Sequence, residues 1–548
     1  MPAGGHADTV RGDQIPAAPY DPEIDPHAPS PAARRSLRFL GRTGLVLLAV
    51  AVAAKGLGFV RDVLLAALFG TSRDTDGFFL VFALWVQVAI TLAGSCVQVF
   101  VPRWHTAHRT DGDAGTRRLL GGTLLAFGAV LTAGAALVAI AAEPVVGAVA
   151  PEFDAQARAA TAQLLRLAAP VLPLSGLAGV LVALAHARGH YLFVKAAALG
   201  MNAGILAALL IGGRSVGLPA AAAGCTLGAI LTLGLTALYP VRHRHVPAIS
   251  GRALAAGLAI LGGVATLTVL GHSGGYLMQL ATRSAWARLP GGQLTSLAYA
   301  TRVIGLPVQM IQFAILTTLI GVLSARVATG RLEEAAELGR STLRVLLFAL
   351  LPLTMAVVLL REPIVRLLFE RGAFTAEATA LTALLLGCLA PATLFAMVRN
   401  VIATAWYARG ALWLPNAVGV LGVVVFVVGA GPVMDLAGGW GLALLQGLAS
   451  ATTLAVLAVL SKPVIQISWA GVGPVVLRVL DAAVPGLAFV AGMEYFGARA
   501  APDGSWDLAV VALGLAGGAG LYVWRARSAG LGPELGMLAG LLRRREDG

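Results

Sequence analysis

Apolar residues recur along this chain in runs of roughly 20 or more, separated by short polar segments. A helix needs about that many apolar residues to cross the hydrocarbon core of a bilayer. The pattern therefore predicts an all-α polytopic membrane protein with about fourteen transmembrane helices. The predicted spans lie near 43–69, 77–101, 119–141, 163–185, 193–212, 217–239, 253–281, 293–323, 342–360, 380–405, 411–431, 437–460, 475–497 and 507–526.

A polar helical segment at 331–340 is expected to lie on the inner surface and to lead into the ninth span. The span count suggests two lobes of six helices followed by a terminal pair, although the sequence shows no strong internal repeat. The predicted units are a disordered cytoplasmic tail at 1–41, a first lobe at 42–245, a second lobe at 246–462, a helix pair at 463–527 and a basic cytoplasmic tail at 528–548.

Basic residues alternate from loop to loop, and this alternation predicts the orientation of the chain. Arginines gather before the first span and after the second, sixth, eighth and last spans, whereas most of the intervening loops hold one or none. The protein is expected in the inner (plasma) membrane. By the positive-inside rule, both of its termini are expected in the cytoplasm. The loop with Arg361, Arg366 and Arg371 is an exception, partly balanced by nearby glutamates.

Composition supports a membrane protein: 12% of residues are charged and the mean hydropathy is +0.82. The net charge of +13 fits arginine-rich loops facing anionic lipid better than a nucleic-acid partner. The three cysteines, Cys96, Cys225 and Cys388, lie in apolar segments and suggest neither a disulfide nor a metal site. Because the start of the chain is polar, no cleavable signal peptide is expected.

The first apolar run contains Lys55, Arg61 and Asp62. A charge at the centre of a spanning helix costs about 2.5–3.5 kcal/mol, so such residues face a wet cavity or extend to the headgroups. We interpret these three as cavity residues; headgroup contact is the alternative. Neighbouring helical residues point about 100° apart, so Arg61 and Asp62 are expected to find different partners. Asp62 is then expected to hold another arginine when the cavity is empty.

Other arginines within or beside the predicted spans are Arg302, Arg399 and Arg283, and Asp76 starts the second span. A guanidinium binds phosphate through two parallel hydrogen bonds, so an arginine-lined cavity suits an anionic ligand. The sequence has no GxxxxGK[ST] phosphate loop, no metal-ligand cluster and no paired carboxylates in its spans. We therefore expect neither an enzyme nor a cofactor.

Four motifs point to a family: GLGFVRD at 56–62 with FG at 69–70 and TDGFF at 75–79; FERGAFT at 369–375; YATR at 299–302; and VR at 398–399 with YARG at 407–410. They resemble the MurJ/MviN flippases of the multidrug/oligosaccharidyl-lipid/polysaccharide exporter superfamily. The resemblance covers most of the chain.

This resemblance implies a flippase that moves lipid II, an undecaprenyl-pyrophosphate-linked peptidoglycan precursor, from the inner to the outer leaflet. It also implies two six-helix lobes around a cationic cavity, and a lipid-tail groove at the last two helices. The family's cavity residues fall on Arg61, Asp62 and Arg302, with Lys55 at the position of a family arginine. Asp76 and Arg399 complete the candidate substrate-binding residues. Partners would be the lipid-linked pyrophosphate, membrane lipids and proteins of cell-wall synthesis or division, with no nucleic acid.

The sequence departs from the family pattern at three places. Residues 83–95 lack the family's paired arginines and glutamate, Gly305 replaces a glutamate, and 253–270 contain no acid of the kind found in sodium-binding members. Three alternatives follow: an exporter of another polyprenyl-linked glycan or amphiphile, a MATE-like exporter of cationic or hydrophobic drugs, and a membrane scaffold without transport. A MATE-like exporter would need acidic residues in the cavity, where this chain offers chiefly arginines.

Overall fold

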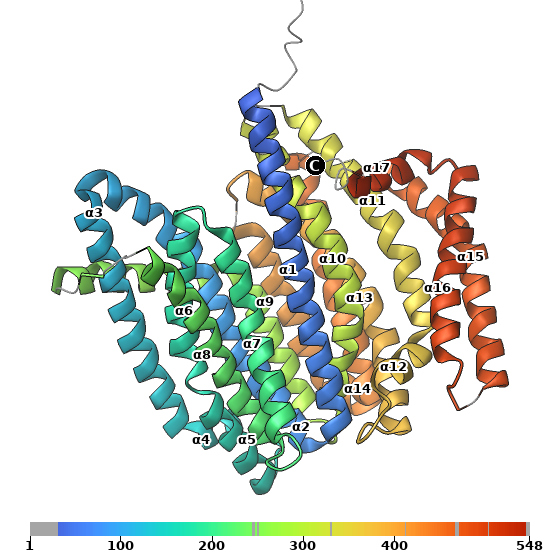
Figure 1. Ribbon diagram of the computed structural model, residues 1–548. Helices are drawn as coiled ribbons and strands as arrows, with labels where there is room; N and C mark the ends of the chain where they lie inside the picture. Colours follow the sequence, from blue (N-terminus) through green and yellow to red (C-terminus); the bar gives the residue numbers. More distant parts are fainter. Residues whose placement is uncertain are drawn as a thin grey trace, which may run out of the picture.

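The computed structural model describes residues 31–243, 247–248, 251–328, 331–411, 413–465, 471–501 and 503–543. Within these ranges the chain forms helices joined by short turns, with no strand, which confirms the all-α prediction (Figure 1). The predicted tail over 1–30 and the last residues of the basic tail lie outside this part of the chain. The first helix begins at Pro31, well before the boundary predicted at residue 42.

The first half of the chain contributes eight α-helices and one short π-helix. They are α1 (Pro31–Phe69), α2 (Arg73–Val81), the π-helical η1 (Phe82–Val86), α3 (Gln87–Ile140), α4 (Ala142–Val149), α5 (Ala155–Ala168), α6 (Val171–Ala187), α7 (Tyr191–Gly212) and α8 (Leu218–Arg242).

The second half contributes six helices and then a terminal group of three. They are α9 (Gly251–Ala287), α10 (Gln293–Ala328), α11 (Leu332–Leu359), α12 (Arg361–Phe369), α13 (Ala376–Ala408), α14 (Trp413–Ile465), α15 (Gly473–Ala500), α16 (Asp507–Ser528) and α17 (Gly532–Arg543).

The long helices α3 and α14 each include residues of two predicted spans, and in each a single glycine forms a sharp bend between them. Gly112 in α3 has φ 59° and Gly438 in α14 has φ 56°. A residue with a Cβ seldom adopts this left-handed conformation, so glycine allows the chain to reverse with few loop residues. The pattern predicted a loop at both places, and in the structure the chain leaves the helical conformation at Gly112 and Gly438.

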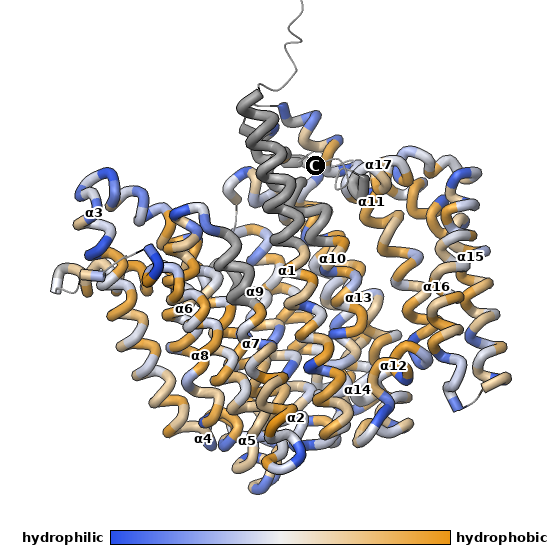
Figure 2. The backbone as a smooth tube through the Cα atoms, in the orientation of Figure 1, coloured by the Kyte–Doolittle hydropathy of each residue, from blue (hydrophilic) through white to orange (hydrophobic). Residues whose placement is uncertain are grey.

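The protein spans the membrane several times. Among the described residues, eight helices are long and apolar enough to cross a bilayer, and two of these contain the bends in α3 and α14. Each predicted span coincides with helical residues over most of its length, although a turn at 169–170 between α5 and α6 interrupts 163–185; the number fourteen stays a prediction. Apolar residues follow the helices, and hydrophilic residues gather mainly towards their ends (Figure 2).

The two ends of the described chain lie on one side of the molecule. The start of α1 and all of α17 are at the top in Figure 1, whereas α2, α4, α5 and α12 are at the bottom. We call these the terminal face and the opposite face. Helix α9 packs against both α3 and α14 and so connects the two halves of the chain. The division into two lobes therefore remains a prediction.

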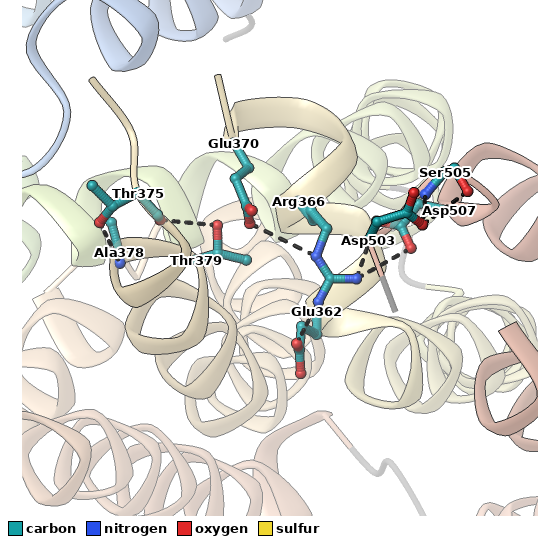
Figure 3. Close-up of polar contacts among 9 residues, drawn as sticks. All are labelled: Glu362, Arg366, Glu370, Thr375, Ala378, Thr379, Asp503, Ser505 and Asp507. Atoms are coloured by element: carbon teal, nitrogen blue, oxygen red, sulfur yellow. Dashed lines mark hydrogen bonds and ion pairs between the residues drawn. The ribbon is translucent and has the colours of Figure 1, made fainter. Parts of the chain in front are cut away.

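The terminal pair α15 and α16 packs on α11 and α12 at one edge of the molecule (Figure 1). The Tyr522 hydroxyl donates to the Phe348 carbonyl at 2.8 Å. On the opposite face, Arg366 of α12 contacts Glu362 at 2.6 Å, Glu370 at 3.7 Å and Asp507 of α16 at 3.4 Å (Figure 3). Carboxylates therefore surround Arg366, one of the three arginines of the loop that departs from the predicted alternation.

Candidate functional site

A cavity of about 480 Å³ lies between helices from both halves of the chain. Its charged residues are Lys55, Arg61 and Asp62 from α1 and Arg302 from α10, so three cations and one carboxylate face it. Helices α3, α6, α7 and α8 and the π-helix η1 supply the rest of the wall, which is mostly apolar. We call this space the central cavity.

Arg61 and Asp62 bind each other, contrary to the expectation from helical geometry. Arg61 Nε and Nη2 donate to the same Asp62 oxygen, Oδ1, at 2.9 and 2.5 Å. The 100° angle separates the Cα–Cβ directions only. The long arginine side chain folds back across that angle, so the expectation of separate partners was wrong.

Further contacts hold Arg61 in place. Its Nη1 donates to Asn202 Oδ1 of α7 at 3.0 Å, and its guanidinium carbon lies 4.9 Å from the centre of the Phe82 ring. The amide of Asn202 in turn donates to the Ala54 carbonyl at 3.1 Å. With 4% of its side chain exposed, Arg61 joins α1, α7 and η1 and has little freedom to move towards a ligand.

Arg302 is held more loosely. Its Nε lies 3.1 Å from Asp62 Oδ2, an ion pair without the alignment of a hydrogen bond. The side chain of Arg302 is 42% exposed, whereas that of Asp62 is 1% exposed. A buried carboxylate thus lies between two arginines, and Arg302 is the one that presents its guanidinium to the cavity.

Lys55 and Gln309 form a second link between α1 and α10. The Lys55 ammonium donates to Gln309 Oε1, and both side chains are exposed to the cavity. Because the ammonium rotates freely and has three donors, it remains able to bind an additional acceptor.

Asp76 lies apart from the other candidates, at the opposite face. Its carboxylate accepts hydrogen bonds from the Gly292 amide at 2.8 Å, the Thr295 amide at 2.8 Å and the Thr295 hydroxyl at 2.7 Å. Asp76 therefore caps the first turn of α10 from another helix. A reciprocal cap between Ser72 and Thr75 begins α2 and fixes the position of Asp76. Sequence reasoning missed Gly292 and Thr295.

Arg399 is also outside the central cavity. It lies on α13, partly buried, and is absent from the cavity wall. The structure thus brings together four of the six predicted site residues and places Asp76 and Arg399 elsewhere.

The motifs of the sequence meet in an aromatic cluster between the central cavity and the opposite face. Tyr299 is its centre, with ring centroids 5.3 Å from Phe79, 4.9 Å from Phe369 and 5.7 Å from Phe374. Phe59 of α1 packs 6.0 Å from Phe369. The five rings come from both halves of the chain and pack together at this place.

Backbone contacts also join the two halves of the chain near this cluster. The Ala373 amide donates to the Ala67 carbonyl at 2.9 Å. Gly70 and Gly372 lie at this contact with φ 58° and 61°, and a Cβ on either would come within 2.2 Å of a carbonyl oxygen. Glycine is needed at both positions, for the backbone conformation and for the close approach.

The comparisons with known proteins identify the family. The model of the family described as "Lipid II flippase MurJ" matches residues 65–513, which is most of the chain. The chain belongs to this family. Among the described residues, no group of three or more His, Cys, Asp or Glu could hold a metal ion.

Two curated relatives are probable lipid II flippases of the same family. The protein of Rhizobium meliloti is 28% identical over 342 residues, and that of Rhizobium tropici is 26% identical over 343 residues. Each alignment covers 59% of this chain and 62% of the relative, which is less than two thirds of that protein's length.

Solved structures show the same fold. A lipid II flippase MurJ in an inward closed conformation matches with a TM-score of 0.72 and 17% identity, over 88% of this chain and 98% of that one. An inward-facing MATE family transporter of the MOP superfamily matches with a TM-score of 0.60 and 10% identity, over 77% of this chain and 98% of that one.

Proposed function

We propose that this protein is a flippase that moves lipid II from the inner to the outer leaflet by alternating access. The observation that carries the proposal is Arg302, a half-exposed guanidinium in a cavity whose wall also holds Lys55 and Arg61. Family membership supports the substrate class, since the matching family model and relatives are described as lipid II flippases.

The cavity suits the pyrophosphate of the substrate. Arg302 and Lys55 are exposed to the cavity, and a guanidinium and an ammonium both bind phosphate oxygens. Among the described residues of the cavity wall, Asp62 is the only carboxylate, and it lies against two arginines, so this part of the wall has no free acid for a cationic substrate. This arrangement favours an anionic substrate over the cationic drugs of a MATE-like exporter.

The pair of arginines on Asp62 supplies a switch. A pyrophosphate that binds Arg302 competes with Asp62 Oδ2 for the same guanidinium. Releasing this contact removes a link between α1 and α10, which lie in different halves of the chain. A ligand shifts a conformational equilibrium only when it binds the two states unequally, and this competition provides the difference.

The aromatic cluster and the Asp76 cap would then form the gate on the opposite face. Opening requires Asp76 to leave the α10 amides and Tyr299 to separate from Phe79. We infer that the terminal face is cytoplasmic, with both termini inside the cell and the protein in the inner (plasma) membrane. The gate described above would then close the external side.

One observation favours a second candidate. The wall segment of α3 that follows η1 offers Gln87, Ile90 and Gly94 to the cavity, and residues 83–95 carry no charge. A lipid-linked glycan other than lipid II, sharing the pyrophosphate but not the remaining headgroup, would also fit this wall.

The test uses the full-length protein reconstituted in vesicles with fluorescent lipid II in the inner leaflet. We expect transport by the wild type, loss in Arg302→Gln, and normal transport in Arg118→Gln, which removes an exposed arginine outside the cavity. Wild-type transport of another polyprenyl-pyrophosphate glycan but not of lipid II would select the second candidate. If the folded wild-type protein transports neither lipid II nor the other glycan, the hypothesis of a membrane scaffold without transport remains.

A further inference from the structure

A second polar cavity, of about 470 Å³, adjoins the central cavity. Gln87 belongs to the walls of both. Helices α3, α9, α10 and α14 line this space, so it also lies between the two halves of the chain. We call it the lateral cavity.

Arg283 of α9 is the charged residue of the lateral cavity. No hydrogen bond or ion pair joins its guanidinium to any residue that the structure describes, and its Nη1 is fully buried without a partner. An unpaired charge removed from water is unfavourable by several kcal/mol. The proposed function gives this arginine no role, because it does not line the central cavity.

Two neutral groups in the same wall also lack partners. Thr282 Oγ1 and Gln446 Oε1 are buried without a hydrogen bond. A threonine hydroxyl can rotate to donate, and the amide of Gln446 can turn its NH2 group inwards. Together with Arg283 they could surround an anion with donors. The described residues of this wall include no Asp or Glu that would bind the guanidinium instead.

We propose that the lateral cavity binds a small anion on Arg283, with Thr282 and Gln446 as further donors. The ligand chemistry is that of a halide or of a single phosphate group. A free halide from solution and a phosphate of the transported substrate are the two sources. The binding itself does not depend on the proposed flippase activity.

Bromide is the probe, because its anomalous scattering locates it in crystals of the full-length protein. The expected result is a bromide peak beside the Arg283 guanidinium in the wild type. In Arg283→Gln this peak is absent, while Arg283→Lys, which keeps the charge, retains it. Bromide found only in the central cavity, or nowhere near Arg283 in a well-ordered wild-type crystal, overturns the proposal.

Thermal unfolding in detergent gives the same test in solution. Bromide is compared with gluconate at equal ionic strength, since an anion that binds only the folded state raises the unfolding temperature. Arg283→Gln should weaken bromide binding about ten-fold or more, whereas Arg166→Gln, a surface arginine, should behave as the wild type. Equal bromide stabilisation in folded Arg283→Gln and wild-type protein contradicts the proposal.

Inorganic pyrophosphate distinguishes the two sources of the anion. If pyrophosphate displaces bromide from Arg283 in wild-type crystals, the site accepts the phosphate of a substrate. If pyrophosphate occupies only the central cavity and bromide stays on Arg283, the site serves a free anion. Both results uphold an anion site in the lateral cavity, and neither requires lipid II transport.

Discussion

Arg61 and Arg302 contact the same carboxylate, yet their surroundings give them different roles. Arg61 is buried and bonded to Asp62 and Asn202, whereas Arg302 reaches Asp62 through one ion pair and is otherwise open to the cavity. The sequence suggests the same role for both, because each is an arginine within an apolar segment. Only the three-dimensional contacts separate an arginine that holds helices together from one that is available to a ligand.

Arg302→Ala is therefore expected to lose pyrophosphate binding with little loss of stability. Arg61→Ala should instead destabilise the fold by about 3 kcal/mol, because it removes the partner of a buried carboxylate. Unfolding temperature and lipid II binding, measured on both purified variants, check this contrast. If Arg302→Ala were unstable and Arg61→Ala stable, Arg302 would be the arginine that holds the helices together and Arg61 the one available to a ligand.

Asp62→Asn tests the switch at the same scale. Asparagine keeps the size of the side chain but removes the charge that attracts Arg302, so the empty protein loses its internal competitor for the substrate. Turnover should fall more than binding weakens. Both quantities are measured on one preparation, with Asn202→Asp as a variant that adds charge next to Arg61. Lost binding together with unchanged conformational cycling would leave Asp62 a purely structural partner.

For the helices and loops, the sequence predicted which segments carry the family motifs but not how these segments pack against one another. The motifs at 56–62, 75–79, 299–302 and 369–375 were selected by resemblance, and their aromatic residues turn out to form one cluster. The partners of Asp76 were out of reach because two of them are backbone amides of a distant helix. Every residue except proline has such an amide, so no residue type marks it in advance.

The cap on α10 supports a prediction for the gate. Asp76→Asn should weaken the hydrogen bonds to Gly292 and Thr295, because charge-assisted bonds are about twice as strong as neutral ones. If the closed state lost about 1.4 kcal/mol of stability, the fraction of molecules open at the opposite face would rise about ten-fold. Spin labels at Glu152 and Glu377, exposed positions on that face, report the distance distribution.

Thr295→Val provides a graded version of this experiment. It removes the hydroxyl bonds to Asp76 and Thr75 but leaves both amide bonds to the Asp76 carboxylate, so its shift should be smaller than that of Asp76→Asn. Thr342→Val, which removes a hydroxyl bond within α11, is the matched control and should leave the distances unchanged. Wild-type distances in Asp76→Asn would show that the cap does not hold the gate closed.

At the scale of the whole molecule, hydropathy alone predicted the helical architecture because each span must be apolar throughout its length. It could not predict how the helices associate, since lipid-facing and helix-facing residues are both apolar. Helix α9 illustrates this: it was assigned to the second lobe, yet it packs against α3 as well as α14. The two-lobe description therefore needs a functional test, in which the halves move relative to each other.

The bend of α14 allows a direct test of the predicted topology. Gly439 lies against Gln293, the first residue of α10, next to the amides capped by Asp76. This places the bend at Gly438 on the opposite face, so a reporter inserted in 431–439 should be external. Reporters after Arg527 and within the bend of α3 at Gly112, on the terminal face, should be cytoplasmic (Figure 1). A cytoplasmic signal from 431–439 in a folded fusion would contradict the fourteen-span topology, because the two predicted spans of α14 could not then both cross the membrane.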